Sequence, residues 1–86
     1  MLELYQLTQL IAIAECGTMS GAAGQLHLSQ PALSRSMQKL EEELQVTLFD
    51  RKKNKIALNQ NGELAVQQAR RVVQQARDLV EQVRAL

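Results

Sequence analysis

The chain has 86 residues, 45% of them hydrophobic, and its ten basic and nine acidic side chains leave a net charge of +1. This length suits one domain with a modest core, and the near-neutral total argues against a general polyanion binder. The N-terminus lacks a signal-peptide pattern, and no apolar run approaches the thickness of a bilayer, so we expect a cytoplasmic protein that does not contact membranes.

The sequence offers little material for catalysis. Cys16 and His27 are each the only residue of their type. Cys16 can therefore form no internal disulfide, and neither residue has a neighbour at the spacing of a metal site or of a catalytic pair. We predict a protein that is not an enzyme and that binds no metal or cofactor.

The charged residues are clustered by sign along the chain, although the net charge is small. Residues 51–55, RKKNK, hold four of the ten basic side chains, and residues 41–43, EEE, hold three of the nine acidic ones. A basic run is often only a solvated loop, so this pattern alone does not establish a contact with phosphates.

Two helices are predicted in the first part of the chain. The first has apolar residues at helical spacing and ends at Gly17; these residues are Leu4, Leu7, Ile11 and Ala14. Thr18 can cap a short second helix, whose apolar side is Ala22, Ala23 and Leu26.

A third helix follows after a tight turn at His27 and Leu28. Ser29 is a good N-cap, and Pro31 falls in the first turn, where its missing N–H does no harm. The predicted apolar stripe of this helix is Leu33, Met37, Leu40 and Leu44. Its opposite face is Pro31, Ser34, Arg35, Gln38 and Glu42.

The rest of the chain predicts a hairpin and a long helix. Residues 55–58 alternate as a strand does and can pair with residues 46–50. Asn59 then caps a helix of about 27 residues, which is about 40 Å long. We expect a domain over residues 1–59 and a linker and dimerisation helix over residues 60–86.

The long helix contains a seven-residue repeat, VQQAR at 66–70 and 73–77 and VEQVR at 80–84. Its predicted dimerisation seam has the alternating spacing of a left-handed coiled coil and consists of Ala65, Ala69, Val72, Ala76, Leu79, Val83 and Leu86. Val66, Val73 and Val80 widen this stripe. Packing on the helix's own domain explains a broad stripe but not three heptads, so we predict a homodimer.

The two short helices and their turn are typical of a helix-turn-helix, whose second helix enters the major groove of DNA. The groove accepts only a slim helix face, which the small residues near Ser34 supply. Arg35 can pair with guanine, and Gln30 or Gln38 with adenine. A solvated face of an ordinary three-helix bundle remains an open alternative. With the basic hairpin beside these helices, the fold class is mainly α, a winged helix-turn-helix with a small β-hairpin wing and a long C-terminal dimerisation helix.

The segment TMSGAAGQLHLSQPALSRSMQKLEEELQVTLFDR resembles the N-terminal domain of LysR-type transcriptional regulators. The resemblance implies base and backbone contacts from Gln30, Pro31, Ser34 and Arg35, phosphate contacts near Thr18 and Ser20, and Arg51 near the minor groove. It also implies that the long helix pairs two subunits. The predicted DNA-binding residues are Thr18, Ser20, Ser29, Gln30, Pro31, Ser34, Arg35, Gln38, Lys39, Arg51, Lys52 and Lys53.

The chain departs from the family pattern at three positions. Gln45 stands where glycine usually ends the third helix, Asn59 replaces a threonine cap, and Gly24 replaces a charged residue. Glutamine is costlier than glycine in a left-handed cap. Family members also continue into a large effector-binding domain, which we expect to be absent from this chain.

The predicted function is therefore sequence-specific binding of double-stranded DNA as a dimer, with transcriptional regulation as the result. The alternative is a winged helix that serves as a protein-docking scaffold, with the coiled coil as its main function. An absence of DNA binding even at low salt, where phosphate contacts are strongest, would favour the scaffold.

Overall fold

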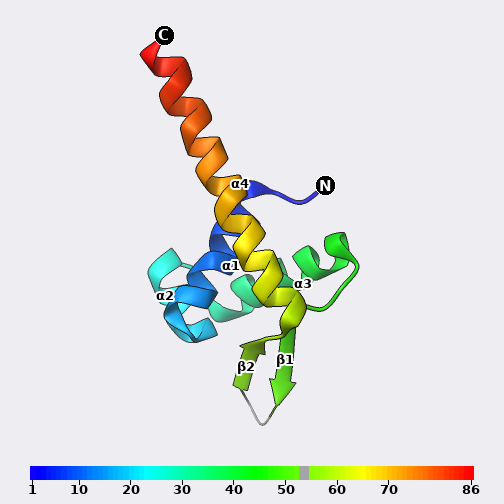
Figure 1. The fold of residues 1–86 in the computed structure, drawn as a ribbon. Helices are drawn as coiled ribbons and strands as arrows, with labels where there is room; N and C mark the ends of the chain where they lie inside the picture. Colours follow the sequence, from blue (N-terminus) through cyan, green and yellow to red (C-terminus); the bar gives the residue numbers. More distant parts are fainter. Residues whose placement is uncertain (53–54) are drawn as a thin grey trace.

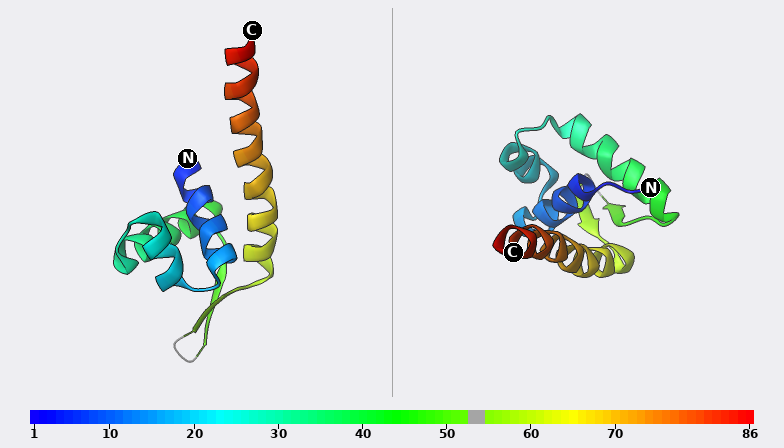
Figure 2. Two further views of the ribbon diagram at one scale, coloured as in Figure 1. Left: turned by 90° about the vertical axis from the view of Figure 1, so that its left-hand side faces the viewer. Right: turned by 90° about the horizontal axis from the view of Figure 1, so that it is seen from above.

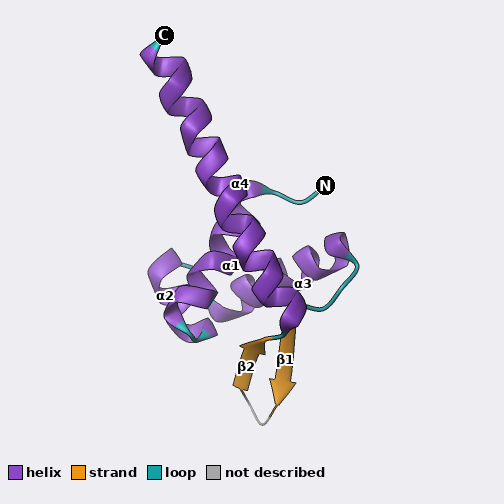
Figure 3. Cartoon of the chain, viewed as in Figure 1, coloured by secondary structure: helices purple, strands orange, loops and turns teal. Residues whose placement is uncertain are grey.

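The computed structural model describes residues 1–52 and 55–86, and the chain is helical over most of this length (Figure 3). The elements in chain order are α1 (Leu4–Cys16), α2 (Met19–Leu26), α3 (Gln30–Leu44), β1 (Phe49–Lys52), β2 (Lys55–Leu58) and α4 (Gln60–Ala85). The two strands form an antiparallel hairpin that projects from the helices (Figure 1). This confirms the predicted mainly α winged helix-turn-helix with a small β-hairpin and a long C-terminal helix, although the first strand lies at residues 49–52 and not at the expected 46–50.

The three predicted N-caps are confirmed. The side chain of Thr18 accepts a hydrogen bond from the Gly21 amide at 2.9 Å, that of Ser29 from Ala32 at 3.1 Å, and that of Asn59 from Gly62 at 2.8 Å. Each bond satisfies an amide that has no partner inside its helix. Short polar side chains therefore fix where α2, α3 and α4 begin.

Left-handed residues end the first three helices. Gly17 has φ of 79°, His27 of 57° and Gln45 of 59°. At the end of α3 the amides of Gln45 and Val46 return to the carbonyls of Glu42 and Glu41, at 3.2 and 3.3 Å. The expected left-handed cap at Gln45 is confirmed, and it is strained because a side chain disfavours this backbone region.

The hydrophobic core surrounds α1, which lies between α3 and α4 (Figure 2). Leu10 of α1 is fully buried, as are Leu33 and Leu40 of α3. The predicted stripe of α3 is confirmed for its first three members, whereas Leu44 is 36% exposed because it lies in the last turn of α3, at the edge of the core. This packing leaves the opposite face of α3 in solvent.

The first half of α4 lies along the core, and the second half extends beyond it (Figures 1 and 2). Its inner stripe, Gly62, Val66, Ala69 and Val73, is buried. The seam prediction for Ala69 is therefore wrong: this residue is 2% exposed and packs inside its own chain. Ala65 is partly buried against the same core. The heptad pattern combined this inner stripe with a neighbouring outer stripe, so Val66 and Val73, which were expected to widen the seam, also pack inside their own chain. The expected division of the chain after residue 59 remains a prediction.

Gly62 lets the first turn of α4 touch the segment that enters the hairpin. A Cβ atom at this position would overlap the carbonyl oxygen of Leu48 and come within 2.8 Å of the Leu58 side chain. The same carbonyl accepts a hydrogen bond from the Asn59 amide at 2.9 Å, so it cannot move away freely. Only glycine fits here without a shift of the backbone.

We expect Gly62→Ala to lower the free energy of unfolding by about 1–3 kcal/mol, because the added methyl group forces two backbone segments apart. The matched control is Gly24→Ala, since a Cβ at Gly24 meets nothing within 4 Å. This control should gain about 0.5–1 kcal/mol from helix propensity. Urea denaturation at one protein concentration measures both, and equal effects would contradict the close contact.

Candidate nucleic-acid interface

The turn between α2 and α3 has the geometry of a helix-turn-helix. The amides of His27 and Leu28 donate to the carbonyls of Gly24 and Ala23, at 3.2 and 2.9 Å. His27 takes the left-handed conformation, and Ser29 begins α3 at once. The N-terminus of α3 is therefore presented to solvent by a short, hydrogen-bonded connection.

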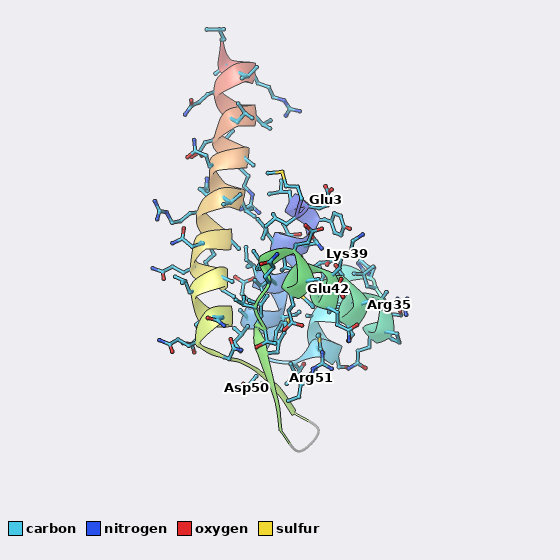
Figure 4. All side chains as sticks on the ribbon, turned by 90° about the vertical axis from the view of Figure 1, so that its right-hand side faces the viewer. Glu3, Arg35, Lys39, Glu42, Asp50 and Arg51 are labelled. Carbon is cyan, nitrogen blue, oxygen red and sulfur yellow. The ribbon has the colours of Figure 1, made fainter. Side chains whose placement is uncertain are left out.

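The outer face of α3 carries the predicted base-reading residues. Gln30, Pro31, Arg35, Gln38 and Lys39 are exposed, and Ser34 is partly buried. Arg35 and Lys39 point away from the body of the molecule (Figure 4). Among the residues that the structure describes, neither cation is in a salt bridge. Their charges are available to an external anion.

Two of the three acidic residues at the other end of α3 have structural partners. A carboxylate oxygen of Glu41 accepts a hydrogen bond from the Leu48 amide at 2.7 Å, just before β1. Glu43 lies 3.3 Å from the N-terminal amine of Met1. Glu41 therefore links α3 to the start of the hairpin. The sequence pattern gave no sign of this bond, because its partner is a backbone amide after the turn.

The hairpin presents alternate side chains to opposite sides. Arg51 pairs in register with Ile56, and Asp50 with Ala57. Arg51 lies on the side of α3, whereas Asp50 lies on the other side (Figure 4). The predicted contacts at Lys52 and Lys53 remain predictions: Lys53 lies outside the described residues, and for Lys52 only the backbone, within β1, is described.

A shallow groove joins the hairpin to the helix-turn-helix. It is lined by residues of the α1–α2 turn, α2, α3 and β2, namely Gly17, Thr18, Met19, Ser20, Gln30, Ile56 and Ala57. Thr18 and Ser20 thus lie beside Gln30 although they are distant in sequence. The hydroxyls of Thr18 and Ser29 accept their capping bonds, so each still has an O–H to donate to a phosphate.

Cys16 and His27, the two residues considered for catalysis, do not line this groove. The thiol of Cys16 donates to the side-chain oxygen of Gln25 at 2.9 Å, and His27 is exposed. Within residues 1–52 and 55–86 no three His, Cys, Asp or Glu side chains are grouped as metal ligands. In the same part of the chain, no helix is both long and apolar enough to span a bilayer.

The arrangement of two helices, tight turn and hairpin agrees with a family model. Residues 4–63 match the model described as bacterial regulatory helix-turn-helix protein, lysR family. The chain belongs to this family. It is 44% identical over 71 residues to the transcriptional regulator TcbR of Pseudomonas sp. strain P51, covering 83% of this chain and 24% of TcbR. The matched part is about a quarter of the length of TcbR.

Two solved DNA-binding domains show the same fold. The DNA-binding domain of CbnR in complex with DNA superposes with a TM-score of 0.91 at 41% identity, over 96% of this chain and 95% of that one. The DNA-binding domain of BenM, solved with benA site 1 DNA, gives a TM-score of 0.90 at 30% identity and covers 96% of both chains. The LysR-type helix-turn-helix and its wing are therefore present here.

Proposed function

We propose that this chain binds double-stranded DNA sequence-specifically as a homodimer and so regulates transcription in the bacterial cytoplasm, by binding and not by catalysis. One observation carries the proposal: Arg35 on α3 and Arg51 on the hairpin are both exposed, form no salt bridge with the residues that the structure describes, and lie on the side of the molecule to which α3 turns its outer face (Figure 4). The DNA complexes of CbnR and BenM, whose folds match this one, support it.

In the proposed complex α3 enters the major groove by its first two turns. The groove is about 12 Å wide, which suits a helix whose tip carries Pro31 and Ser34 in place of bulky side chains. Arg35 donates to a guanine edge, and Gln30 or Gln38 pairs with adenine. The acidic end of α3 stays outside the groove, where Glu41 and Glu43 already have partners.

Phosphate contacts surround this reading face, which is the outer side of α3 with Gln30, Ser34, Arg35 and Gln38. The N-termini of α2 and α3 provide unpaired amides and partial positive charge beside Thr18, Ser20 and Ser29. Arg51, with Lys52 and Lys53 after it in the sequence, brings the wing to the minor groove. Such contacts set orientation and overall affinity, while the side chains of α3 set the sequence preference.

Arg35→Ala should cost about 1–3 kcal/mol of binding to a duplex selected by this chain from a random pool, and it should relax the preference at one base pair. Fluorescence anisotropy with the selected duplex and with a mixed-sequence duplex of equal length measures both. Arg77→Ala is the charge-matched control, because Arg77 is exposed on α4, away from the wing. Equal losses on the two duplexes would show that Arg35 contacts only phosphate.

Arg51→Ala should weaken binding to both duplexes by the same factor, because a phosphate contact does not depend on sequence. It should also reduce the slope of log K against log salt by about one unit. The measurement is a salt titration from low to moderate ionic strength, again with Arg77→Ala as control. An unchanged slope would mean that Arg51 is merely solvated.

The proposed dimer forms through an outer stripe on the second half of α4, consisting of Val72, Ala76, Leu79, Val83 and Leu86. Val72 is 48% exposed, Leu79 63% and Val83 65%, so these side chains are largely uncovered within one chain. Full burial of a Val or Leu side chain contributes about 1.5–3 kcal/mol. A second α4 supplies a matching apolar surface, and its pairing holds two recognition helices on one DNA face.

Replacing both Val72 and Leu79 with Asp should give a folded monomer, because an unpaired buried charge costs several kcal/mol while the inner stripe of α4 is untouched. Its affinity for a duplex with two half-sites should fall by about 100-fold, with little change on one half-site. Sedimentation velocity and anisotropy measure the two effects. Gln60→Asp with Gln67→Asp, two exposed positions outside the stripe, should remain dimeric. A dimeric Val72 and Leu79 variant would refute the interface.

A further inference from the structure

A hydrogen bond between α1 and α3 lies directly behind the reading face. The hydroxyl of Ser36 donates to the side-chain oxygen of Gln9. Gln9 is 8% exposed and Ser36 is partly buried. Among the residues that the structure describes, this is the one side-chain hydrogen bond that connects α3 to another helix.

Apart from the bond from the Leu48 amide to Glu41 near the end of α3, the remaining contacts of α3 with the core are apolar and not directional. Its buried residues are Leu33, Met37 and Leu40, and Met37 is an unbranched side chain that adapts to small shifts of its neighbours. Apolar packing of this kind keeps α3 against the core but tolerates small rotations and translations of the helix. The end of a long outward side chain lies much farther from the helix axis than the backbone does, so a small rotation of α3 displaces the Arg35 guanidinium more than the backbone.

Ser36 follows Arg35 directly in α3. A bond that fixes the rotation of α3 at Ser36 therefore also fixes the direction in which the Arg35 side chain leaves the helix. A rotation of α3 that turns Arg35 away from its base also breaks the bond to Gln9. It then leaves a polar group without a partner in a site with little access to water, which is costly. The bond therefore resists rotations of α3 that would weaken its discrimination between bases.

We infer that Gln9 and Ser36 are positioning residues for DNA recognition, which hold α3 at the rotation where Arg35 and its neighbours meet the base edges. This inference rests on the proposed function. Neither residue touches DNA in it: Gln9 is buried in α1, and Ser36 faces the core side of α3. Their contribution is to the preference for one sequence over others, and not to the general attraction for phosphate.

The test compares the parent with Gln9→Met combined with Ser36→Ala, which removes both polar partners while nearly keeping their shapes. Such a pair of replacements is close to neutral for stability. The probes are a duplex selected from a random pool by the parent chain and a mixed-sequence duplex of the same length. The quantity of interest is the ratio of the two affinities, together with the urea midpoint.

We expect this ratio to fall by about 5–10-fold while the urea midpoint and the affinity for mixed-sequence DNA stay near those of the parent. An unchanged ratio in a stable variant would overturn the inference, and so would equal losses on both duplexes. If the parent itself does not bind DNA at low salt, the proposed function fails instead, so the two failures are distinguishable.

Single variants keep the test decisive if the double variant folds poorly. Ser36→Ala removes one hydroxyl from a helix and should lower the ratio, whereas Ser36→Thr keeps a hydroxyl and should largely restore it. Thr8→Val is the matched control, because the Thr8 hydroxyl donates within α1, to the carbonyl of Tyr5 at 2.8 Å. A parental ratio in Ser36→Ala would refute the inference.

Discussion

Burial of α1 between the other helices is the interaction on which the rest of the structure depends. Leu10 has no exposed surface, and α1 contacts α2, α3 and α4, while α3 and α4 lie on opposite sides of it (Figure 2). The reading face of α3 and the outer stripe of α4 are therefore both positioned by the same short helix. A chain of this size has one core, so the proposed DNA-binding and dimer surfaces share a single support.

Features set by neighbouring residues in the chain were predictable from the sequence. Thr18, Ser29 and Asn59 cap their helices through amides three residues away, so the signal and its target lie in one short segment. The apolar stripe of α3 follows from its period in the same way. The exposed positions of Arg35 and Gln38 follow in turn, because the opposite face of a buried stripe lies in solvent.

Features set by distant partners were not predictable. The seam assigned to α4 included Ala69, which is buried in the core of its own chain, because a heptad pattern shows that a stripe is apolar but not which surface covers it. The bonds from Glu41 to the Leu48 amide and from Ser36 to Gln9 depend on how separate elements meet. The contact that requires Gly62 likewise appears only once α4 lies against Leu48.

The division of α4 into two stripes has a consequence for the proposed dimer. One continuous helix carries both the inner stripe, which is fixed to α1, and the outer stripe, which would meet a second subunit. No flexible linker separates the core from the proposed interface, because α4 is one helix over Gln60–Ala85, and a helix without proline bends only gently over this length. The distance between the two α3 helices of a dimer would then depend on two helix contacts. These are α3 against α1 within each subunit and α4 against α4 of the second subunit. Because half-site spacing on DNA is fixed by the turn of the duplex, such a rigid connection favours operators of one spacing and disfavours others.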